Sequence, residues 1–263
     1  MTDTSIRPAA VAGLFYTAEP GALRNQVDSY LDNSGAFTWQ PKAIITPHAG
    51  FIYSGPTAGV AWACAAQRKD RIKRVLLLGP NHRVPLRGTA TSPAGYWQTP
   101  LGAIALDVNG AKELQSLPFI QPVEIAHARE HCLEVQVPFI QVLFPEAQLL
   151  PLLVGETTPQ QVADVLRRYW NDASTLIVVS SDLSHYHDYQ TARQLDRDTS
   201  RHIEHCEIAH IGPEQACGCR AICGLLYLAA EKHALISTLD LCNSGDTAGD
   251  RLRVVGYGAY AVH

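Results

Sequence analysis

The stretch Ala43-Ile44-Ile45-Thr46-Pro47-His48-Ala49-Gly50 joins a short apolar run to a histidine and a glycine-containing loop. The same form recurs in residues 75–82, which end in His82, and in residues 176–185, which end in His185. Apolar runs of this length are typical of short strands that are buried on both faces. Ligands of open α/β sheets bind at the carboxyl ends of the strands. The three runs therefore predict one shared site at that edge of a sheet.

Helix-like and strand-like patterns alternate along the chain and predict an α/β fold. Strands are expected at 42–46, 73–78, 147–153, 175–179, 234–241 and 252–262. Helices are expected at 20–31, 57–67, 109–117, 130–143, 159–170, 189–208 and 217–231, and a hairpin insertion at 84–107. Pro138 should kink or divide the fourth of these helices. We find no internal repeat or linker, so residues 1–263 are interpreted as a single domain.

Composition excludes several classes of protein. Hydrophobic residues make up 46% of the chain and charged residues 17%, which is typical of a globular protein and not of a disordered one. A net charge of −4 gives no bulk attraction to nucleic acid or to an anionic membrane. No apolar run reaches the roughly 20 residues needed to span a bilayer, and the N-terminus lacks a secretory signal. Seven scattered cysteines do not indicate a disulfide framework, so we expect a cytoplasmic protein with reduced thiols.

His48 and His82 stand at equivalent positions after two predicted strands, which suggests a metal site. Imidazole suits transition metals such as iron and zinc, and two histidines with one carboxylate form a recurring Fe(II) and oxygen site. Asp246 in the last loop and Asp182 are the candidate carboxylates. Alternatively, each histidine hydrogen-bonds its neighbours at the end of its strand.

Asp182 and His185 form a second candidate pair. Three positions apart after a strand, they could share one helical turn, with the aspartate orienting the histidine as a general acid or base. Alternatively, Asp182 caps the following turn. We expect the adjacent His187 to face solvent.

Glu130, His131 and Glu134 open the helix expected at 130–143, with the two glutamates four positions apart. Acidic residues in a first turn also complement the helix dipole, so this motif is weak by itself. It is not the His-Glu-x-x-His pattern of zinc proteases, because the second histidine is missing.

The remaining cysteines and histidines indicate less. Cys219 and Cys223 lie four apart on an apolar helix and are interpreted as core residues, whereas Cys217 at its start is more open. Cys242 precedes the last loop and could be a ligand or a redox thiol. The chain has no phosphate-binding glycine loop and no Gly-x-Ser-x-Gly elbow. A solvated helix face is the simplest reading of His202, His205 and His210.

Several motifs together resemble the Memo-like family, whose bacterial and archaeal members occur beside AMMECR1-like and radical-SAM proteins. They run in order along nearly the whole chain: residues 7–16 (RPAAVAGLFY), 47–55 (PHAGFIYSG), 79–82 (GPNH), 130–139 (EHCLEVQVPF), 180–186 (SSDLSHY) and 243–246 (NSGD). The family is similar in fold to class III extradiol dioxygenases of the LigB type. The resemblance implies an α/β/α layered domain around a mostly parallel sheet.

The resemblance also implies roles for particular residues. His48 and His82 would take the positions of the two histidine ligands, and His185 that of the acid/base histidine. Memo itself uses a cysteine of the last loop as third ligand, whereas the extradiol enzymes use a glutamate. In this chain Asp246 is expected there, with Cys242 as the alternative. A carboxylate would favour iron, and a thiolate would favour copper or zinc.

The leading hypothesis from the sequence is a non-haem Fe(II) dioxygenase or redox enzyme that acts on a small substrate. Glu130, His131 and Glu134 would line its cavity around the ligands. One alternative is a protein that binds a peptide or partner in the same cleft without turnover. Another is a zinc-type metallohydrolase.

Overall fold

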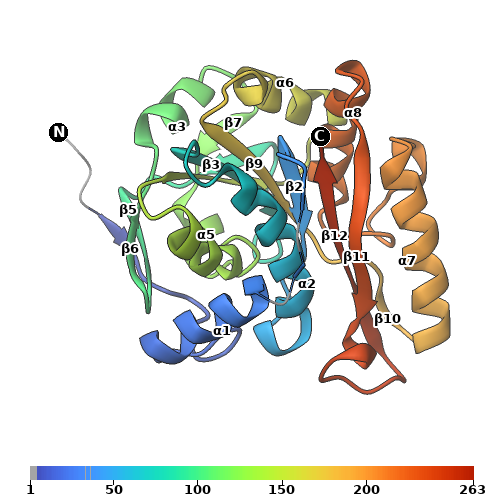
Figure 1. The fold of residues 1–263 in the computed structure, drawn as a ribbon. Coiled ribbons are helices and arrows are strands. Elements are labelled where there is room, and N and C mark those ends of the chain that lie inside the picture. The colour runs from blue at the N-terminus through green and yellow to red at the C-terminus, as the bar shows by residue number, and fades with distance from the viewer. Residues whose placement is uncertain (1–4, 33, 36) are drawn as a thin grey trace.

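Four parallel strands form the centre of the main sheet. A computed structural model describes residues 5–32, 34–35 and 37–263. The central strands lie side by side in the order β2 (Ala43–Thr46), β9 (Thr175–Ser180), β3 (Arg74–Pro80) and β8 (Gln148–Val154). Their order differs from their order along the chain, so crossover connections run over both faces of the sheet (Figure 1).

Antiparallel strands extend the sheet at both sides of this centre. β12 (Val254–Val262) pairs with β2, and β10 (His185–His187) and β11 (Ile236–Asn243) pair with β12. At the other side, β4 (Thr89–Thr91) pairs with β8, and β7 (Ile120–Pro122) pairs with β4. The sheet has nine strands in the described part of the chain. A separate sheet of β1 (Ile6–Arg7), β5 (Tyr96–Thr99) and β6 (Gly102–Ala105) contains the hairpin predicted within 84–107.

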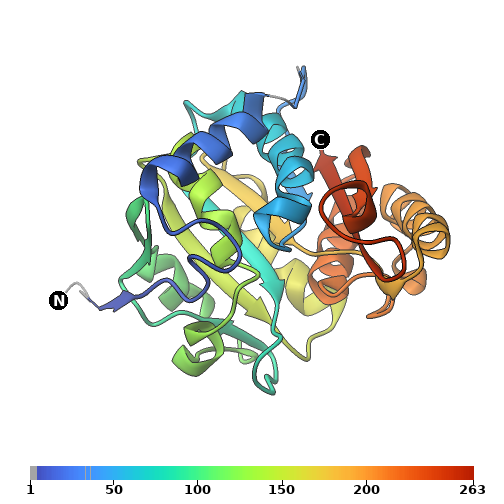
Figure 2. The same cartoon turned by 90° about the horizontal axis from the view of Figure 1, so that it is seen from below.

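Helices cover both faces of the main sheet, which confirms the predicted α/β/α layers. One face carries α1 (Pro20–Asp32), α2 (Phe51–Ala65) and α5 (Val137–Leu143). The other carries α3 (Val108–Leu114), α6 (Pro159–Trp170), α7 (Tyr189–Glu204) and α8 (Cys219–Glu231). Figure 2 shows α7 and α8 beside the C-terminal strands and α1 over the opposite region. Shorter elements are α4 (Glu124–Ala128) and the 3-10 helices Ala66–Arg68, Glu134–Gln136, Ile208–His210 and Ser244–Asp246.

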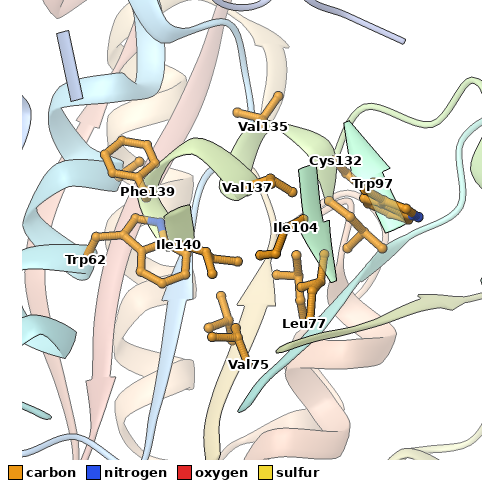
Figure 3. Close-up of a cluster of buried hydrophobic side chains, with 14 of the residues drawn as sticks. Trp62, Val75, Leu77, Trp97, Ile104, Cys132, Val135, Val137, Phe139 and Ile140 are labelled. Atoms are coloured by element: carbon orange, nitrogen blue, oxygen red, sulfur yellow. The ribbon is translucent and has the colours of Figure 1, made fainter. Parts of the chain in front are cut away.

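Alternation along the central strands divides the core into two clusters. Val75 and Leu77 of β3 pack with α2 and α5, whereas Leu76 and Leu78 pack against α6 and α8. Successive side chains of a strand point to opposite faces, so a strand covered on both faces is apolar throughout. Figure 3 shows the first cluster, in which the rings of Trp62 and Phe139 stack with their centroids 6.0 Å apart. The apolar runs of the sequence are thus the buried centre of the sheet.

The helix predicted over 130–143 is the clearest error in the predicted elements. α4 ends at Ala128, residues 130–133 form a turn, and a 3-10 helix leads into α5. Pro138 lies in the first turn of α5, where a missing backbone N–H costs nothing. It therefore begins a helix and does not kink one. None of the helices in the described ranges is both long enough and apolar enough to cross a membrane.

Candidate metal centre

Three neighbouring parallel strands deliver polar side chains to the same edge of the sheet, as predicted. His48 follows β2, His82 follows β3, and Asp182 follows β9, which lies between those two strands. Their side chains line a cavity of about 750 Å³, which we call the histidine chamber. Its lining residues are His48, His82, Arg83, His131, Asp182, His185, Tyr186, His187, Pro213, Glu214 and Cys217.

Hydrogen bonds behind His48 determine which of its ring nitrogens faces the chamber. Nδ1 of His48 lies 3.0 Å from Oγ of Ser180. That hydroxyl donates to the Cys132 carbonyl at 2.7 Å and accepts from Nε2 of Gln136 at 3.1 Å. Its remaining capacity is an acceptor site, so Nδ1 of His48 is the donor. Nε2 therefore carries the lone pair, and this is the nitrogen that meets the chamber residues Cys217 and Asp182.

A buried carboxylate, that of Glu130, determines which ring nitrogen of His82 carries the proton. Oε1 of Glu130 accepts from Nδ1 of His82 at 2.9 Å, and Oε2 accepts from its backbone N–H at 2.7 Å. Burial by itself would raise the pKa of Glu130, but hydrogen bonds from His131 and His82 lower it well below its usual range. The carboxylate is therefore ionised and fixes Nδ1–H on His82, which leaves Nε2 free. A carboxylate behind a histidine is the usual outer-shell partner of a metal ligand.

His131 is the third imidazole of the chamber. Its backbone N–H donates to Glu130 at 2.9 Å, and its ring stacks on His82 with centroids 4.8 Å apart. One nitrogen each from His48, His82 and His131 lie within 4.8 Å of one another, close enough to share an ion. A second metal-competent group in the described residues consists of His82, Glu130 and Cys132.

A glycine brings the turn of His131 against the sheet. A Cβ on Gly79 of β3 would lie 2.7 Å from Cδ2 of Leu133 and 2.9 Å from Sγ of Cys132. Only a residue without a side chain lets the 130–133 turn approach β3 so closely. The sequence predicted Glu130 and His131 near the site. The structure places Glu130 behind the chamber, where it bonds His82, and His131 in the chamber wall.

Burial keeps His48 neutral. Burial is the largest cause that lowers the pKa of His48 to about 3, with smaller lowering effects from His82 and His131, while Asp182 opposes the shift. A neutral imidazole is the form that binds a metal. His48 is thus held in its ligand form at any ordinary pH.

Asp182 and His185 both line the chamber, but Asp182 does not orient His185. Oδ1 of Asp182 accepts from the backbone N–H of His48 at 2.7 Å, and Oδ2 lies 3.9 Å from Nε2 of the same residue. Nδ1 of His185 lies instead 2.8 Å from the carbonyl of Leu183. The two residues are not on one helical turn, because the chain after β9 extends into β10. His185 is therefore oriented by the backbone, with Nε2 free.

The last loop does not reach the histidine chamber. Asp246 accepts from the Tyr189 hydroxyl at 2.5 Å and from the Asn243 backbone N–H at 3.1 Å. Oγ1 of Thr57 lies 3.0 Å from Sγ of Cys242. Asp246 and Cys242 line a separate pocket of about 180 Å³ between α7 and β11. The structure thus puts His131, and not Asp246 or Cys242, beside the two histidines, because these contacts hold both side chains near α7 and α2.

Glu134 lies in the core, away from the chamber. Its carboxylate pairs with Arg7 at 2.6 Å and accepts from the Tyr16 hydroxyl at 2.7 Å. It also accepts from the backbone N–H groups of Ala10 and Val11. The structure therefore gives Glu134 a different place from the cavity lining that we expected, because it fixes the N-terminal segment.

The other predicted thiols and histidines divide between core, surface and chamber. Cys219 and Cys223 are buried on α8, as predicted. His205 and His210 are exposed, and His202 pairs with Glu207. His187 was expected in solvent but is half-buried in the chamber wall, because β10 pairs with β12. Arg83 and Glu214 also line the chamber but were not predicted from the sequence. The position of Arg83 next to His82 was a signal for the first, and no signal in the sequence pointed to Glu214.

A second cavity of about 600 Å³ adjoins the histidine chamber. The two share His131, Asp182, His185 and Tyr186. Its other lining residues are aromatic, charged or small, and they include Phe15, Tyr53, Tyr257, Asp250 and Arg253. The Arg253 guanidinium lies over the Tyr186 ring, 5.1 Å from its centroid. The site is therefore a two-part cleft, in which His48 and His82 line one part and His131 and His185 line both.

Comparison with known proteins identifies the family of this site. The profile of the family described as Memo-like protein matches residues 7–261. The chain belongs to the Memo-like family. A MEMO1 family protein from Thermoplasma volcanium is 33% identical over 263 residues, with 96% of each chain covered. One from Aquifex aeolicus is 32% identical, with 96% of this chain and 97% of that protein covered.

The fold of this Memo-like chain also occurs at much lower sequence similarity. The crystal structure of an uncharacterized protein from Escherichia coli K12 has a TM-score of 0.50 and 10% sequence identity. The match covers 82% of this chain and 98% of that chain. At this identity the match shows the fold alone.

The chamber of this Memo-like protein fits a transition-metal ion. Three imidazoles are the type of donor that iron, copper and zinc accept, and His48 and His82 have their second nitrogen occupied by a hydrogen bond. Neighbouring carboxylates, Glu130 and Asp182, complement a cation. The donor set does not fix which metal is bound.

Proposed function

We propose that this Memo-like protein is a metal-dependent enzyme of the extradiol dioxygenase type, with Fe(II) held by His48, His82 and His131. The observation that carries the proposal is the convergence of three imidazole nitrogens, within 4.8 Å of one another, on an open chamber. A bound Fe(II) would supply open coordination positions for a chelating substrate and for dioxygen.

His185 is the proposed acid/base residue. It lies in the wall of the same chamber, and its Nδ1 is engaged by the Leu183 carbonyl, so Nε2 can accept a proton from a substrate hydroxyl. The proton would then be held on the His185 ring. Asp182 keeps the His48 backbone in place and adds a negative charge that would stabilise both a cation and a protonated His185.

The two-part cleft suggests a substrate larger than a single ring. The histidine chamber would take the chelating part, and the adjoining cavity, with Phe15 and Tyr53 in its wall, would take an apolar or aromatic extension. We propose a small organic molecule with neighbouring hydroxyl groups, such as a substituted catechol.

The test begins with metal content. Protein purified without oxygen and reconstituted with Fe(II) should bind about one iron per chain, and the variant His48→Ala/His82→Ala should lose it. The matched control, His205→Ala/His210→Ala, changes two exposed histidines and should keep full iron content. Full metal occupancy in the first variant would refute the metal centre.

Oxygen uptake then tests the reaction. Reconstituted protein should consume dioxygen with members of a panel of substituted catechols, and His185→Gln should lower the rate without removing the iron. Because acid/base groups contribute about 10²–10⁴-fold, the loss should lie in that range. Iron binding without oxygen uptake with any catechol would support the metal centre but refute the proposed dioxygenase activity.

A zinc-dependent hydrolase is a second candidate, and the same three histidines favour it. Three histidines with one open position form a recurring catalytic zinc site, in which zinc lowers the pKa of bound water. This candidate predicts ester or phosphoester hydrolysis by zinc-loaded protein in the absence of oxygen. Association with AMMECR1-like or radical-SAM proteins, which the family resemblance implies, is likewise proposed and would be tested by co-purification.

A further inference from the structure

Tyr186, between His185 and His187 in β10, has a backbone conformation that a tyrosine rarely adopts. Its φ angle is 64°, in the left-handed region where a Cβ crowds the backbone and glycine is favoured. In the described part of the chain, the other non-glycine residues with positive φ are Cys206 and His233. Both stand two positions after the last residue of a helix, where a left-handed residue is common. Tyr186 lies within a strand, so its conformation has a different origin.

A β-bulge produces this conformation. His185 and His187 pair with two consecutive residues of β12, so two steps along β10 match one step along β12. Tyr186 is the extra residue. Just before the bulge, the Ser184 carbonyl accepts from the Gly256 N–H at 2.8 Å, which ties the chain to β12. Bulges are frequent next to active sites, where they re-aim a side chain.

The bulge turns three consecutive side chains to one cavity. Successive side chains of a regular strand point to opposite faces, so Tyr186 would point away from a chamber that His185 and His187 line. All three line the histidine chamber, and Tyr186 and His185 also line the second cavity. The Tyr186 ring therefore stands where the two cavities join.

The fold gains little from this ring. Tyr186 is 64% exposed. Its ring meets the His185 ring edge-on, with centroids 5.6 Å apart, and the Arg253 guanidinium lies 5.1 Å from its centroid. Contacts of an exposed ring contribute little to stability. A strained backbone that supports an exposed ring points to a role in binding, because such strain collects at ligand-binding sites.

A second aromatic residue borders the same junction. The Phe15 ring lies against the His131 ring, with centroids 4.7 Å apart, and Phe15 lines the second cavity. Phe15 beside His131 and Tyr186 beside His185 thus flank the histidines that the two cavities share. Ring pairs add to the effect of apolar burial, so such walls favour an aromatic ligand over an aliphatic one.

We propose that the Tyr186 ring is a binding surface for the aromatic ring of the substrate, at the junction of the two cavities. The bulge aims the tyrosine, and the Arg253 guanidinium supports its ring. Tyr186 is a specificity-determining residue that selects molecules with a ring next to the chelating group. This deepens the proposed function and rests on it for the chelating group alone.

Two chelators that differ by one ring give the test. Acetohydroxamate and benzohydroxamate carry the same metal-binding group, and only the second has an aromatic ring. Zn(II)-loaded native protein should bind benzohydroxamate more tightly in calorimetric titrations. Tyr186→Ala should lower the affinity for benzohydroxamate about tenfold and leave that for acetohydroxamate unchanged, because only the ring contact is lost. Tyr186→Phe keeps the ring and should keep the native preference.

Tyr186→Gly separates binding from folding. Glycine has no Cβ to crowd the backbone at this φ, so the folded-to-unfolded ratio in urea should be about 2- to 5-fold higher than in Tyr186→Ala. The glycine variant should nevertheless bind benzohydroxamate as weakly as the alanine variant. The control His233→Gly relieves the same strain at an exposed position after α8 and should keep both native affinities.

Metal-free protein makes the result independent of the metal centre. 2-Naphthol has rings but no chelating pair; it should bind to metal-free native protein, and Tyr186→Ala should weaken that binding about tenfold. Native affinity for both ring compounds in Tyr186→Ala would overturn the proposal. So would native protein that binds the two hydroxamates equally, which leaves the metal centre intact. If neither hydroxamate binds but 2-naphthol binding depends on Tyr186, the metal centre is refuted and the ring site stands.

Discussion

At the scale of single residues, the site depends on which nitrogen of each histidine is left free. Ser180 and Gln136 determine this for His48, and Glu130 determines it for His82. None of the three is expected to touch a metal, yet they orient the groups that would. Their removal should therefore weaken metal binding without removing a ligand.

Glu130→Gln is the sharpest test of this orientation. The amide can occupy the same space, but it lacks the charge that fixes Nδ1–H on His82 and supports a nearby cation. We expect the affinity for Zn(II) or Co(II), measured by competition with a chromophoric chelator, to fall about 10–100-fold. The control Glu156→Gln changes an exposed carboxylate and should leave affinity unchanged, whereas an unchanged affinity in Glu130→Gln would show that the carboxylate does not support the site.

Glu134→Ala should separate stability from metal binding. The change leaves Arg7 buried without its partner, and breaking such a pair costs about 3–5 kcal/mol. Urea unfolding should show this loss of stability. Under conditions in which the variant is fully folded, its metal affinity should equal that of the native chain. Glu134→Gln, which keeps an acceptor for the backbone N–H groups of Ala10 and Val11, should lose less. A tenfold fall in metal affinity would instead show that Glu134 contributes to the metal site.

At the scale of elements, the chamber is the place where strand ends meet loops from elsewhere in the chain. β2, β3 and β9 bring His48, His82 and Asp182, and the short strand β10 brings His185. The 130–133 turn and the start of α8 add His131 and Cys217. Gly79 and Gly218 permit these last two approaches.

Gly79→Ala should therefore affect stability and metal binding together. The new methyl group would lie 2.7 Å from Leu133 and 2.9 Å from Cys132, so the 130–133 turn must move. Overpacking of this kind costs about 1–3 kcal/mol, and the displaced Glu130 and His131 should weaken metal binding. Unfolding curves and metal titrations measure both effects.

Gly21→Ala is the matched control for this change. Its added methyl group meets only the exposed Glu19 carboxylate at 3.4 Å, at the start of α1. Stability and metal affinity should both stay close to the native values. Normal metal affinity in Gly79→Ala would mean that the turn does not position His131.

At the scale of the whole molecule, the two-sided covering of the sheet buries histidines that must stay neutral. Burial lowers the pKa of His48 to about 3 and that of His127 to about 3, from an ordinary value of 6.5. Nε2 of His127 lies 3.2 Å from the Ala90 carbonyl, far from solvent. Both residues link the stability of the fold to pH.

The direction of this linkage follows from the lowered pKa values. Between pH 6.5 and about 3 the unfolded chain binds protons that the folded chain does not, so stability falls as the pH falls. Each histidine contributes a slope of about 1.4 kcal/mol per pH unit where it is fully protonated in the unfolded state. Urea unfolding in the presence of a chelator, between pH 7 and 5, should show the decline.

His127→Gln should remove one of the groups that bind a proton only on unfolding. The fall of unfolding free energy with falling pH should then be shallower by about 1.4 kcal/mol per pH unit near pH 5. His205→Gln changes an exposed histidine and should keep the native slope. Identical slopes in native protein and His127→Gln would show that His127 does not carry the linkage.

The sequence by itself determined the parts of the fold that depend on local periodicity. Apolar runs marked the central strands because a strand buried on both faces must be apolar throughout. The position of a histidine directly after such a run placed His48 and His82 at one edge, since parallel strands end on the same side. The family motifs pointed to the same two residues.

Only the tertiary structure decided which of the other candidate side chains meet these two histidines. Asp246, Asp182 and Glu134 are all carboxylates near recognisable motifs, but their hydrogen-bond partners come from distant segments that periodicity does not reveal. His131 and Cys217 reach the chamber through close packing at two glycines, Gly79 and Gly218. Such contacts depend on how strands, turns and helices pack in space, so the local sequence does not predict them.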